Sequence, residues 1–287
     1  MKTCVSSYSF GHYNSDLSLP GVIRKAAEMG FQEIEFTDGG WLDDPTLIDE
    51  MRETAAEVGL PIANVCVGAD FLNGSGGDLK DEIRRLQKRV DAVARLGARS
   101  MRHDVGWGVS GRSYAIGYDD VLPILATGCR EVTRYAAEKH GIVTMTENHG
   151  QFSQDSVRVE KLINAVADPN FGTLIDIGNF LCVDEDPTEA VGRMTPYAKH
   201  VHVKDFHIRS GMEVAPGEGW FTSRAGNYLR GAIVGHGNAK VYQSLRVLHD
   251  RGYHGTVSIE FEGLEDNLRG LSIGLNNLKR FLSMIGE

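Results

Sequence analysis

The sequence predicts an α/β fold, a single (β/α)₈ TIM barrel that spans residues 1–287. Short runs with strand character recur eight times, and segments with helical periodicity separate them. A strand that follows a helical crossover pairs in parallel with an earlier strand, because antiparallel neighbours need only a short turn. Eight such units are the number that closes a barrel, so we expect one domain.

The expected strands occur at regular intervals from the first residues to the last turn of the chain. An open doubly wound sheet is the alternative, and it would carry a G-x-G-x-x-G fingerprint after its first strand. The segment 10–14 reads Phe-Gly-His-Tyr-Asn and lacks that fingerprint. The eight expected strands are Val5–Phe10, Glu33–Thr37, Ile62–Val67, Ser100–His103, Val143–Glu147, Thr173–Asp176, His200–Val203 and Val257–Glu260.

The intervening segments have helical patterns and end at glycines. In Leu79–Leu96 and Val157–Val166, apolar residues recur at steps of three and four. A glycine between a helical pattern and the next strand is typical of a helix C-cap. The glycines in that position are Gly30, Gly59, Gly97, Gly141 and Gly252.

Two stretches exceed what a minimal barrel needs. Gly106–Tyr118 follows the fourth strand, and Ile208–Asn238 follows the seventh. Long segments in compact domains commonly form lids or binding loops. We expect residues 208–238 to cover the barrel mouth, or that of a partner subunit, with Trp220 and Phe221 as apolar cover.

Composition excludes several classes of protein. The hydrophobic fraction of 41% and the charged fraction of 24% are ordinary for a globular protein. The net charge of −9 disfavours nucleic-acid binding, which needs a basic surplus. No apolar run reaches the roughly 18 residues of a membrane span, and the first residues show no export signal. The four scattered cysteines suggest buried thiols rather than disulfides, so we expect a cytoplasmic protein.

Ionisable residues occur at the ends of five successive strands, where sites on (β/α)₈ barrels lie. Such charges have little reason to gather around one barrel mouth in a purely structural protein. Carboxylates that lie close together repel one another, and a bound cation removes that repulsion. The strand-end groups are Arg102-His103-Asp104, Glu147-Asn148-His149, Asp176–Asn179, His202 with Lys204-Asp205, and Glu260-Phe261-Glu262.

Three carboxylates and one imidazole among these groups predict a metal site. Such an oxygen-rich set suits Mn²⁺ best among our candidates, and it also accepts Mg²⁺, Co²⁺ or Zn²⁺. Each residue alone would be read as a solvated strand end or a helix N-cap. Glu262 is a further candidate ligand because it shares the strand face of Glu260. The four expected ligands are Glu147, Asp176, His202 and Glu260.

Further residues are candidates for substrate binding, and each has a structural alternative. Lys204 either binds a substrate oxygen or pairs with a carboxylate such as Asp205. His103 either contacts substrate or pairs with Asp104. Trp107 either stacks on a sugar face or packs its loop on the barrel. The six candidates are His103, His149, Asn179, Lys204, His236 and Trp107.

Several segments resemble the xylose isomerase-like TIM-barrel superfamily of sugar phosphate isomerases and epimerases. The resemblance covers most of the chain and is strongest from Val143 to Leu282. Its members carry a divalent metal on the residues that match our four ligands. The segments that carry the resemblance are Thr146–Gly150, Leu174–Phe180, His200–Asp205, Gly235–Asn238, Arg251–Gly255 and Ser258–Gly263.

The resemblance implies a metal-dependent sugar isomerase or epimerase. Glu147 and Glu260 would act as the catalytic acid/base pair on the carbon next to a ketose carbonyl. The sequence departs from the ketose 3-epimerases at Asn179, where those enzymes carry a second histidine.

Three other functions stay open at this point. The first is a lyase, either a dehydratase of keto-sugars or keto-inositols or a deglycosidase that cleaves oxidised glycosides. The second is an apurinic endonuclease, which Asn179, the missing D-x-H after strand seven and the net charge disfavour. The third is a non-catalytic sugar binder. The expected partner is a small polyhydroxylated substrate, with no nucleic acid and no membrane, and self-association as a homo-oligomer is left open.

Overall fold

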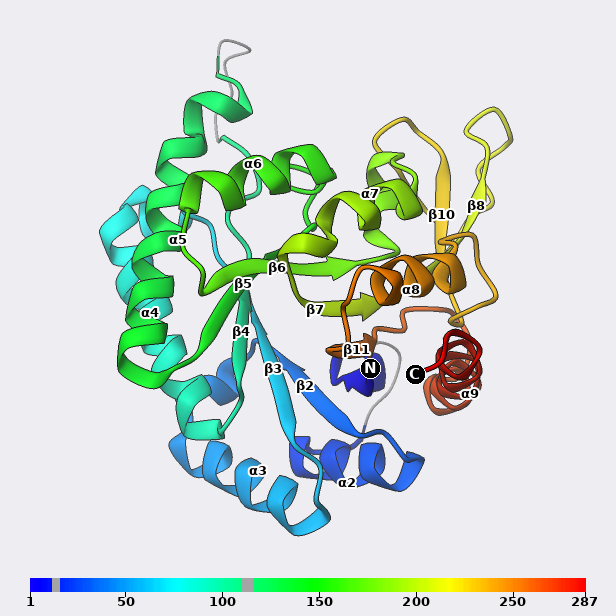
Figure 1. The fold of residues 1–287 in the computed structure, drawn as a ribbon, viewed down its shortest axis with the longest axis horizontal. Helices are drawn as coiled ribbons and strands as arrows, with labels where there is room; N and C mark the ends of the chain where they lie inside the picture. Colours follow the sequence, from blue (N-terminus) through cyan, green and yellow to red (C-terminus); the bar gives the residue numbers. More distant parts are fainter. Residues whose placement is uncertain (12–15, 110–115) are drawn as a thin grey trace.

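The computed structural model describes residues 1–11, 16–109 and 116–287 and confirms the closed (β/α)₈ barrel (Figure 1). Its eight strands are parallel, in the order β1-β11-β7-β6-β5-β4-β3-β2, and β1 closes the barrel by pairing with both β11 and β2. The barrel strands are β1 Lys2–Ser6, β2 Glu33–Thr37, β3 Ile62–Val67, β4 Ser100–His103, β5 Val143–Glu147, β6 Phe171–Asp176, β7 Ala198–Val203 and β11 Thr256–Ile259.

Helices surround the barrel as its outer layer (Figure 1). Short 3₁₀ turns cover Gly40–Asp43, Gly74–Gly77, Asn179–Val183 and Thr195–Tyr197. The α-helices are α1 Tyr8–Gly11, α2 Leu19–Met29, α3 Pro45–Val58, α4 Leu79–Leu96, α5 Tyr118–His140, α6 Ser156–Val166, α7 Pro187–Met194, α8 Val241–Asp250 and α9 Asn267–Ile285.

The first strand is the largest error of the sequence prediction. We expected a strand over Val5–Phe10, whereas β1 covers Lys2–Ser6 and Tyr8–Gly11 forms the short helix α1. A short apolar run fits a strand or a helical turn equally well, so its pattern could not separate the two. The other strand boundaries differ from the prediction by at most two residues. Residues 110–115 of the predicted loop Gly106–Tyr118 lie outside the described part of the chain.

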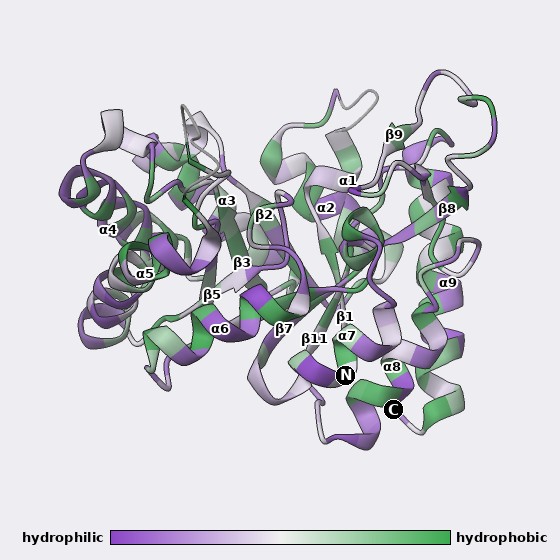
Figure 2. Cartoon of the chain, turned by 90° about the horizontal axis from the view of Figure 1, so that it is seen from above, coloured by the Kyte–Doolittle hydropathy of each residue, from purple (hydrophilic) through white to green (hydrophobic). Residues whose placement is uncertain are grey.

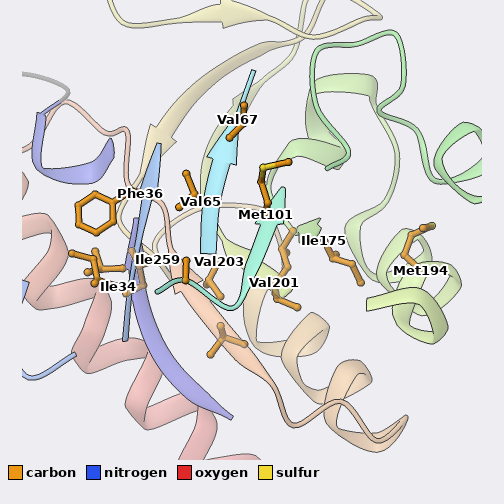
Figure 3. Close-up of a cluster of buried hydrophobic side chains, with 14 of the residues drawn as sticks. Ile34, Phe36, Val65, Val67, Met101, Ile175, Met194, Val201, Val203 and Ile259 are labelled. Atoms are coloured by element: carbon orange, nitrogen blue, oxygen red, sulfur yellow. The ribbon is translucent and has the colours of Figure 1, made fainter. Parts of the chain in front are cut away.

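An apolar layer between strands and helices holds the barrel together. Alternate strand residues such as Ile34, Val65, Val201 and Ile259 are fully buried and face the helices (Figure 3). Outward residues of the helices are hydrophilic, as α4 shows in Figure 2. The intervening strand residues face the barrel interior, and many of them are polar. Polar side chains therefore lie inside the barrel, and the apolar core lies between the strands and the surrounding helices.

The segment after β7 is an antiparallel sheet rather than a loop. Strand β8 (Asp205–Arg209) pairs with β10 (Tyr228–Ala232), which pairs with β9 (Phe221–Thr222). We call these three strands the insertion sheet. In Figure 1 it projects from the barrel beside α7 and α8. None of the described helices is long and apolar enough to cross a membrane.

Candidate active site

Four side chains from neighbouring strands meet at the barrel mouth. Glu147 and Asp176 end β5 and β6, His202 lies on β7, and Glu260 follows β11. The Nδ1 atom of His202 lies 3.6 Å from Glu147 Oε1, 3.8 Å from Asp176 Oδ2 and 3.5 Å from Glu260 Oε2. Each of the four offers a ligand atom, and these atoms lie within 4.8 Å of one another. The structure therefore brings the four predicted ligands together, and we call them the tetrad.

The tetrad has unsatisfied polar atoms that a cation would satisfy. Asp176 Oδ2 and His202 Nδ1 are buried and have no hydrogen-bond partner in the described structure. Buried polar atoms without partners are costly, so they commonly mark the place of an ion or water. Carboxylate oxygens with one imidazole nitrogen form a donor set that suits Mg²⁺ or Mn²⁺. The residues present thus fit a divalent cation.

Both glutamates of the tetrad are held in the ionised form. Burial opposes the ionisation of Glu147, but Arg102 and His202 hold its pKa well below its usual range. Burial also opposes the ionisation of Glu260, but Lys204 and His202 lower its pKa to about 2. Ionised carboxylates are the form that binds a metal.

Lys204 lies next to the tetrad and carries a buried positive charge. Its Nζ lies 2.7 Å from Glu260 Oε2, 3.3 Å from Asp176 Oδ2 and 3.7 Å from Glu262 Oε2. Lys204 thus pairs with these carboxylates and not with Asp205, and its contact with a substrate oxygen stays a prediction. Asp205 instead accepts backbone N–H groups from Gly235, Gly237 and Ala239.

Asn179 links two members of the tetrad. Its Nδ2 donates to Glu147 Oε1 at 3.0 Å, and its backbone N–H donates to Asp176 Oδ1 at 2.9 Å. Its side-chain oxygen accepts from Lys204 Nζ at 3.3 Å. Asn179, predicted as a substrate contact, therefore orients the carboxylates of the site.

A row of ion pairs connects the tetrad to His149. Arg102 NH2 lies 2.6 Å from Glu147 Oε2 and 2.9 Å from Asp104 Oδ1. The Nδ1 atom of His149 lies 3.1 Å from the same Asp104 oxygen. Sequence reasoning noted Arg102 at a strand end and missed its role. The alternation of strand residues was the signal, since Arg102 faces the barrel interior and His103 does not.

Glu35 of β2 supports the tetrad from inside the barrel. Its Oε1 lies 2.7 Å from His202 Nε2, and its Oε2 lies 3.1 Å from His200 Nε2. Ser258 and Asn64 donate hydrogen bonds to the same carboxylate. Burial opposes its ionisation, but His202 and His200 hold the pKa of Glu35 well below its usual range. A carboxylate on the far nitrogen of a metal-binding histidine fixes the ring and strengthens its ligand atom.

We expect Glu35→Gln to weaken Mn²⁺ binding by about 10- to 100-fold, the usual effect of removing such a support. Isothermal titration calorimetry of the metal-free protein measures this directly. Glu33→Gln is the matched control, because Glu33 lies on the same strand but pairs with Lys2 and Arg99 at the other end of the barrel. Equal affinities for the Glu35 variant and the wild type would show that this carboxylate does not support the site.

The tetrad opens into a cavity of about 200 Å³, the mouth cavity. Pockets for drug-sized ligands usually measure about 300–1,000 Å³, so this cavity suits one small ring. Its lining combines two carboxylates of the tetrad with the positively charged side chains of Arg102 and Lys204 and with the imidazole of His149. The residues that line it are Tyr8, Thr37, Cys66, Arg102, Glu147, His149, Lys204, Glu260 and Glu262.

Of the six predicted substrate residues, His149 and Lys204 line this cavity, and the other four are not among its lining residues in the described part of the chain. His103 points toward the helices, between the rings of Phe71 and Phe171, and burial lowers its pKa to about 4. His236 is exposed in the turn that Asp205 holds. Trp107 borders a neighbouring pocket. Strand alternation turns the His103 side chain away from the barrel interior, and substrate contacts of His236 and Trp107 stay predictions.

The insertion sheet does not line the mouth cavity in the described chain. Trp220 lies near the guanidinium groups of Arg209 and Arg230, and Phe221 packs on Phe206. Asp184, in the loop after β6, accepts hydrogen bonds from the turn before β10. Trp220 and Phe221 are thus not among the residues that line the mouth cavity, and cover of a barrel mouth by residues 208–238 stays a prediction.

Comparisons with known proteins agree with the barrel fold. Residues 23–281 match the model of a family described as xylose isomerase-like TIM barrels. An inosose dehydratase of Mesomycoplasma hyopneumoniae is 23% identical over 198 residues, which cover 66% of this chain and 63% of that protein. The chain thus spans less than two-thirds of that relative's length.

Solved structures share the fold over nearly the whole chain. The 3-keto-D-glucoside 4-epimerase of E. coli has a TM-score of 0.73 at 17% identity, covering 98% of this chain and 99% of that one. A xylose isomerase-like TIM-barrel protein of Mycobacterium smegmatis, in complex with magnesium, has a TM-score of 0.74 at 18% identity, covering 99% of this chain and 97% of that one. At these identities the likeness establishes the fold.

Proposed function

The chain belongs to the xylose isomerase-like TIM-barrel family, and on that premise we propose that it is a divalent metal-dependent sugar isomerase or epimerase. It would remove a proton from the carbon next to a carbonyl of a small polyhydroxylated substrate. One observation carries the proposal: the four ligand atoms of the tetrad gather within 4.8 Å of one another beside the mouth cavity. We propose Mn²⁺ as the preferred ion, with Mg²⁺, Co²⁺ and Zn²⁺ as alternatives.

The residues of the cavity supply the parts that this reaction needs. A divalent cation on the tetrad would act as a Lewis acid and stabilise the negative charge that forms on the carbonyl oxygen. Glu147 and Glu260 enter the cavity from β5 and from the end of β11. One carboxylate can take the proton while the other returns it. The buried ammonium of Lys204 can donate a hydrogen bond to a substrate oxygen in the same cavity.

A lyase is the second candidate, and His149 favours it. This imidazole lines the mouth cavity outside the tetrad, and Asp104 holds its Nδ1 at 3.1 Å. A histidine oriented by a carboxylate is a typical general base or acid, which elimination of a hydroxyl or an aglycone would require. The inosose dehydratase among the relatives agrees with this candidate.

Proton exchange in D₂O separates the two candidates. The Mn²⁺-loaded protein would be incubated with ketohexoses, keto-inositols and 3-keto-glycosides, and carbon-bound deuterium would be followed by NMR. Deuterium uptake with every hydroxyl retained supports the isomerase or epimerase. Loss of a hydroxyl or an aglycone supports the lyase, and His149→Ala should then lower the rate by about 100-fold or more. No exchange with any of these substrates would overturn the proposal.

We expect the protein neither to bind nor to cleave abasic DNA at physiological salt. The net charge of −9 gives no basic surplus to neutralise phosphates. Asn179 stands where the related endonucleases would carry a further histidine. A gel assay with an abasic duplex and Mn²⁺ measures both effects, and metal-dependent incision by the pure protein would reverse our ranking of the functions.

A further inference from the structure

A second pocket of about 600 Å³ lies beside the mouth cavity, and the function proposed above does not use it. Loops after β3, β4 and β5 form its walls together with Arg158 of α6, and Arg224 reaches it from the turn between β9 and β10. Its lining residues include Trp107, Gly150, Gln151, Phe152, Arg158 and Arg224. Its volume lies within the range of ordinary ligand pockets. We call it the side pocket.

The ring pair of Trp107 and His149 separates the two spaces. Trp107 lines the side pocket and His149 lines the mouth cavity. Their ring centroids are 5.2 Å apart, in an edge-to-face arrangement. Gly150 and Gln151, the next residues after His149, also line the side pocket. A ligand that occupies the mouth cavity therefore needs to extend past only one pair of rings to reach the side pocket.

The indole of Trp107 is exposed and yet held in place. It is 54% exposed, which is high for so large an aromatic side chain. It packs closely on Gly150, where an added Cβ would lie only 2.7 Å from the indole Cζ3 atom. The glycine thus leaves room for the ring, and His149 supports its edge. An exposed ring fixed at a pocket wall provides a flat apolar surface for another ring.

The rim of the side pocket is polar but does not form an anion site. Arg224 donates to the Gln151 carbonyl at 2.7 Å, and Arg158 donates to the Phe152 carbonyl at 2.9 Å. Both guanidinium groups also lie within 3.5 Å of Asp155 Oδ2, which neutralises part of their charge. Fixed donors around a flat apolar wall suit a neutral ring that carries hydroxyl groups.

We propose that the side pocket binds a second ring of the substrate, so that the natural substrate is a glycoside rather than a free monosaccharide. The inference rests on the proposed function, since it places the reacting ring in the mouth cavity. The second ring, an aromatic aglycone or another sugar, would lie on Trp107. The shared chemistry is a flat apolar face with a hydroxylated edge.

Binding of unreactive glucosides tests this without relying on turnover. The probes are methyl β-D-glucoside, which has one ring, and phenyl β-D-glucoside and cellobiose, which have two. We expect at least one two-ring probe to bind the Mn²⁺-loaded protein at least tenfold more tightly than the methyl glucoside, by calorimetry. The two-ring probe that binds more tightly then identifies the second ring as an aromatic aglycone or as a sugar.

Trp107→Ala should abolish that advantage and leave the affinity for the methyl glucoside within twofold. Trp107→Phe should keep part of it, because the smaller ring still offers an apolar face. Tyr242→Ala is the matched control, since Tyr242 packs on Phe281 and lines neither space. Equal affinities for one-ring and two-ring probes, or an advantage that survives Trp107→Ala, would overturn the inference. Failure of the proposed function would appear separately, as no deuterium exchange in the NMR assay.

Discussion

Asp176→Asn is expected to lower turnover at least 1,000-fold, which corresponds to about 4 kcal/mol of barrier. Asp176 is fully buried at the end of β6, and its Oδ2 has no hydrogen-bond partner while pointing toward His202 and Lys204. An amide keeps the shape and can still accept the Asn179 N–H, but it removes one of three anionic ligands. The cation should therefore bind much more weakly, and the Lewis acid would be lost with it.

Metal content and turnover should be measured on the same sample, by elemental analysis and by deuterium exchange. Asp168→Ala is the matched control, because Asp168 lies before β6, at the opposite end of the strand, and its side chain accepts only the Asn170 N–H among the bonds described. That variant should keep its metal and its rate. Full turnover of Asp176→Asn in the presence of a chelator would show that the reaction does not use the tetrad.

The barrel could be predicted because each strand carries its own local signal. Strands β2, β3, β4 and β5 have the predicted boundaries, since a helix that ends at a glycine precedes each of them. The insertion sheet could not be predicted in this way. Arg209 pairs with Tyr228 across a long Gly-rich connection, and the pattern of a short strand does not specify such a distant partner.

The tetrad could be predicted because its members lie at or next to the ends of their strands, and these strand ends on a barrel share one face. The residues that support the tetrad lie deeper inside the barrel. Glu35 and His200 are mid-strand, and only the alternation of side chains places them inside the barrel. Reading every inward position, not only the last, would have found both. Arg102 would have been separated from His103 by the same rule.

Arg102→Met is expected to destabilise the metal-free protein by about 3–5 kcal/mol, the usual cost of leaving a buried ion pair without one partner. Arg102 is buried, and its guanidinium pairs with Asp104 at 2.9 Å and Glu147 at 2.6 Å. Methionine fills much of the volume but leaves two carboxylates close together in a buried environment. Their repulsion then opposes folding. Urea unfolding followed by circular dichroism measures the change in the free energy of unfolding.

Arg99→Met is the matched control, because it lies just before β4 and its side chain is 51% exposed in its pair with Glu33. Pairs with an exposed partner contribute little, so we expect a loss of about 1 kcal/mol or less. A saturating divalent cation should restore part of the stability of Arg102→Met, since an ion on the tetrad would neutralise Glu147 in place of the guanidinium. Equal losses for the two variants would show that the buried pairing adds nothing to stability. A loss at Arg102 that Mn²⁺ leaves unchanged would show that Glu147 does not bind the ion.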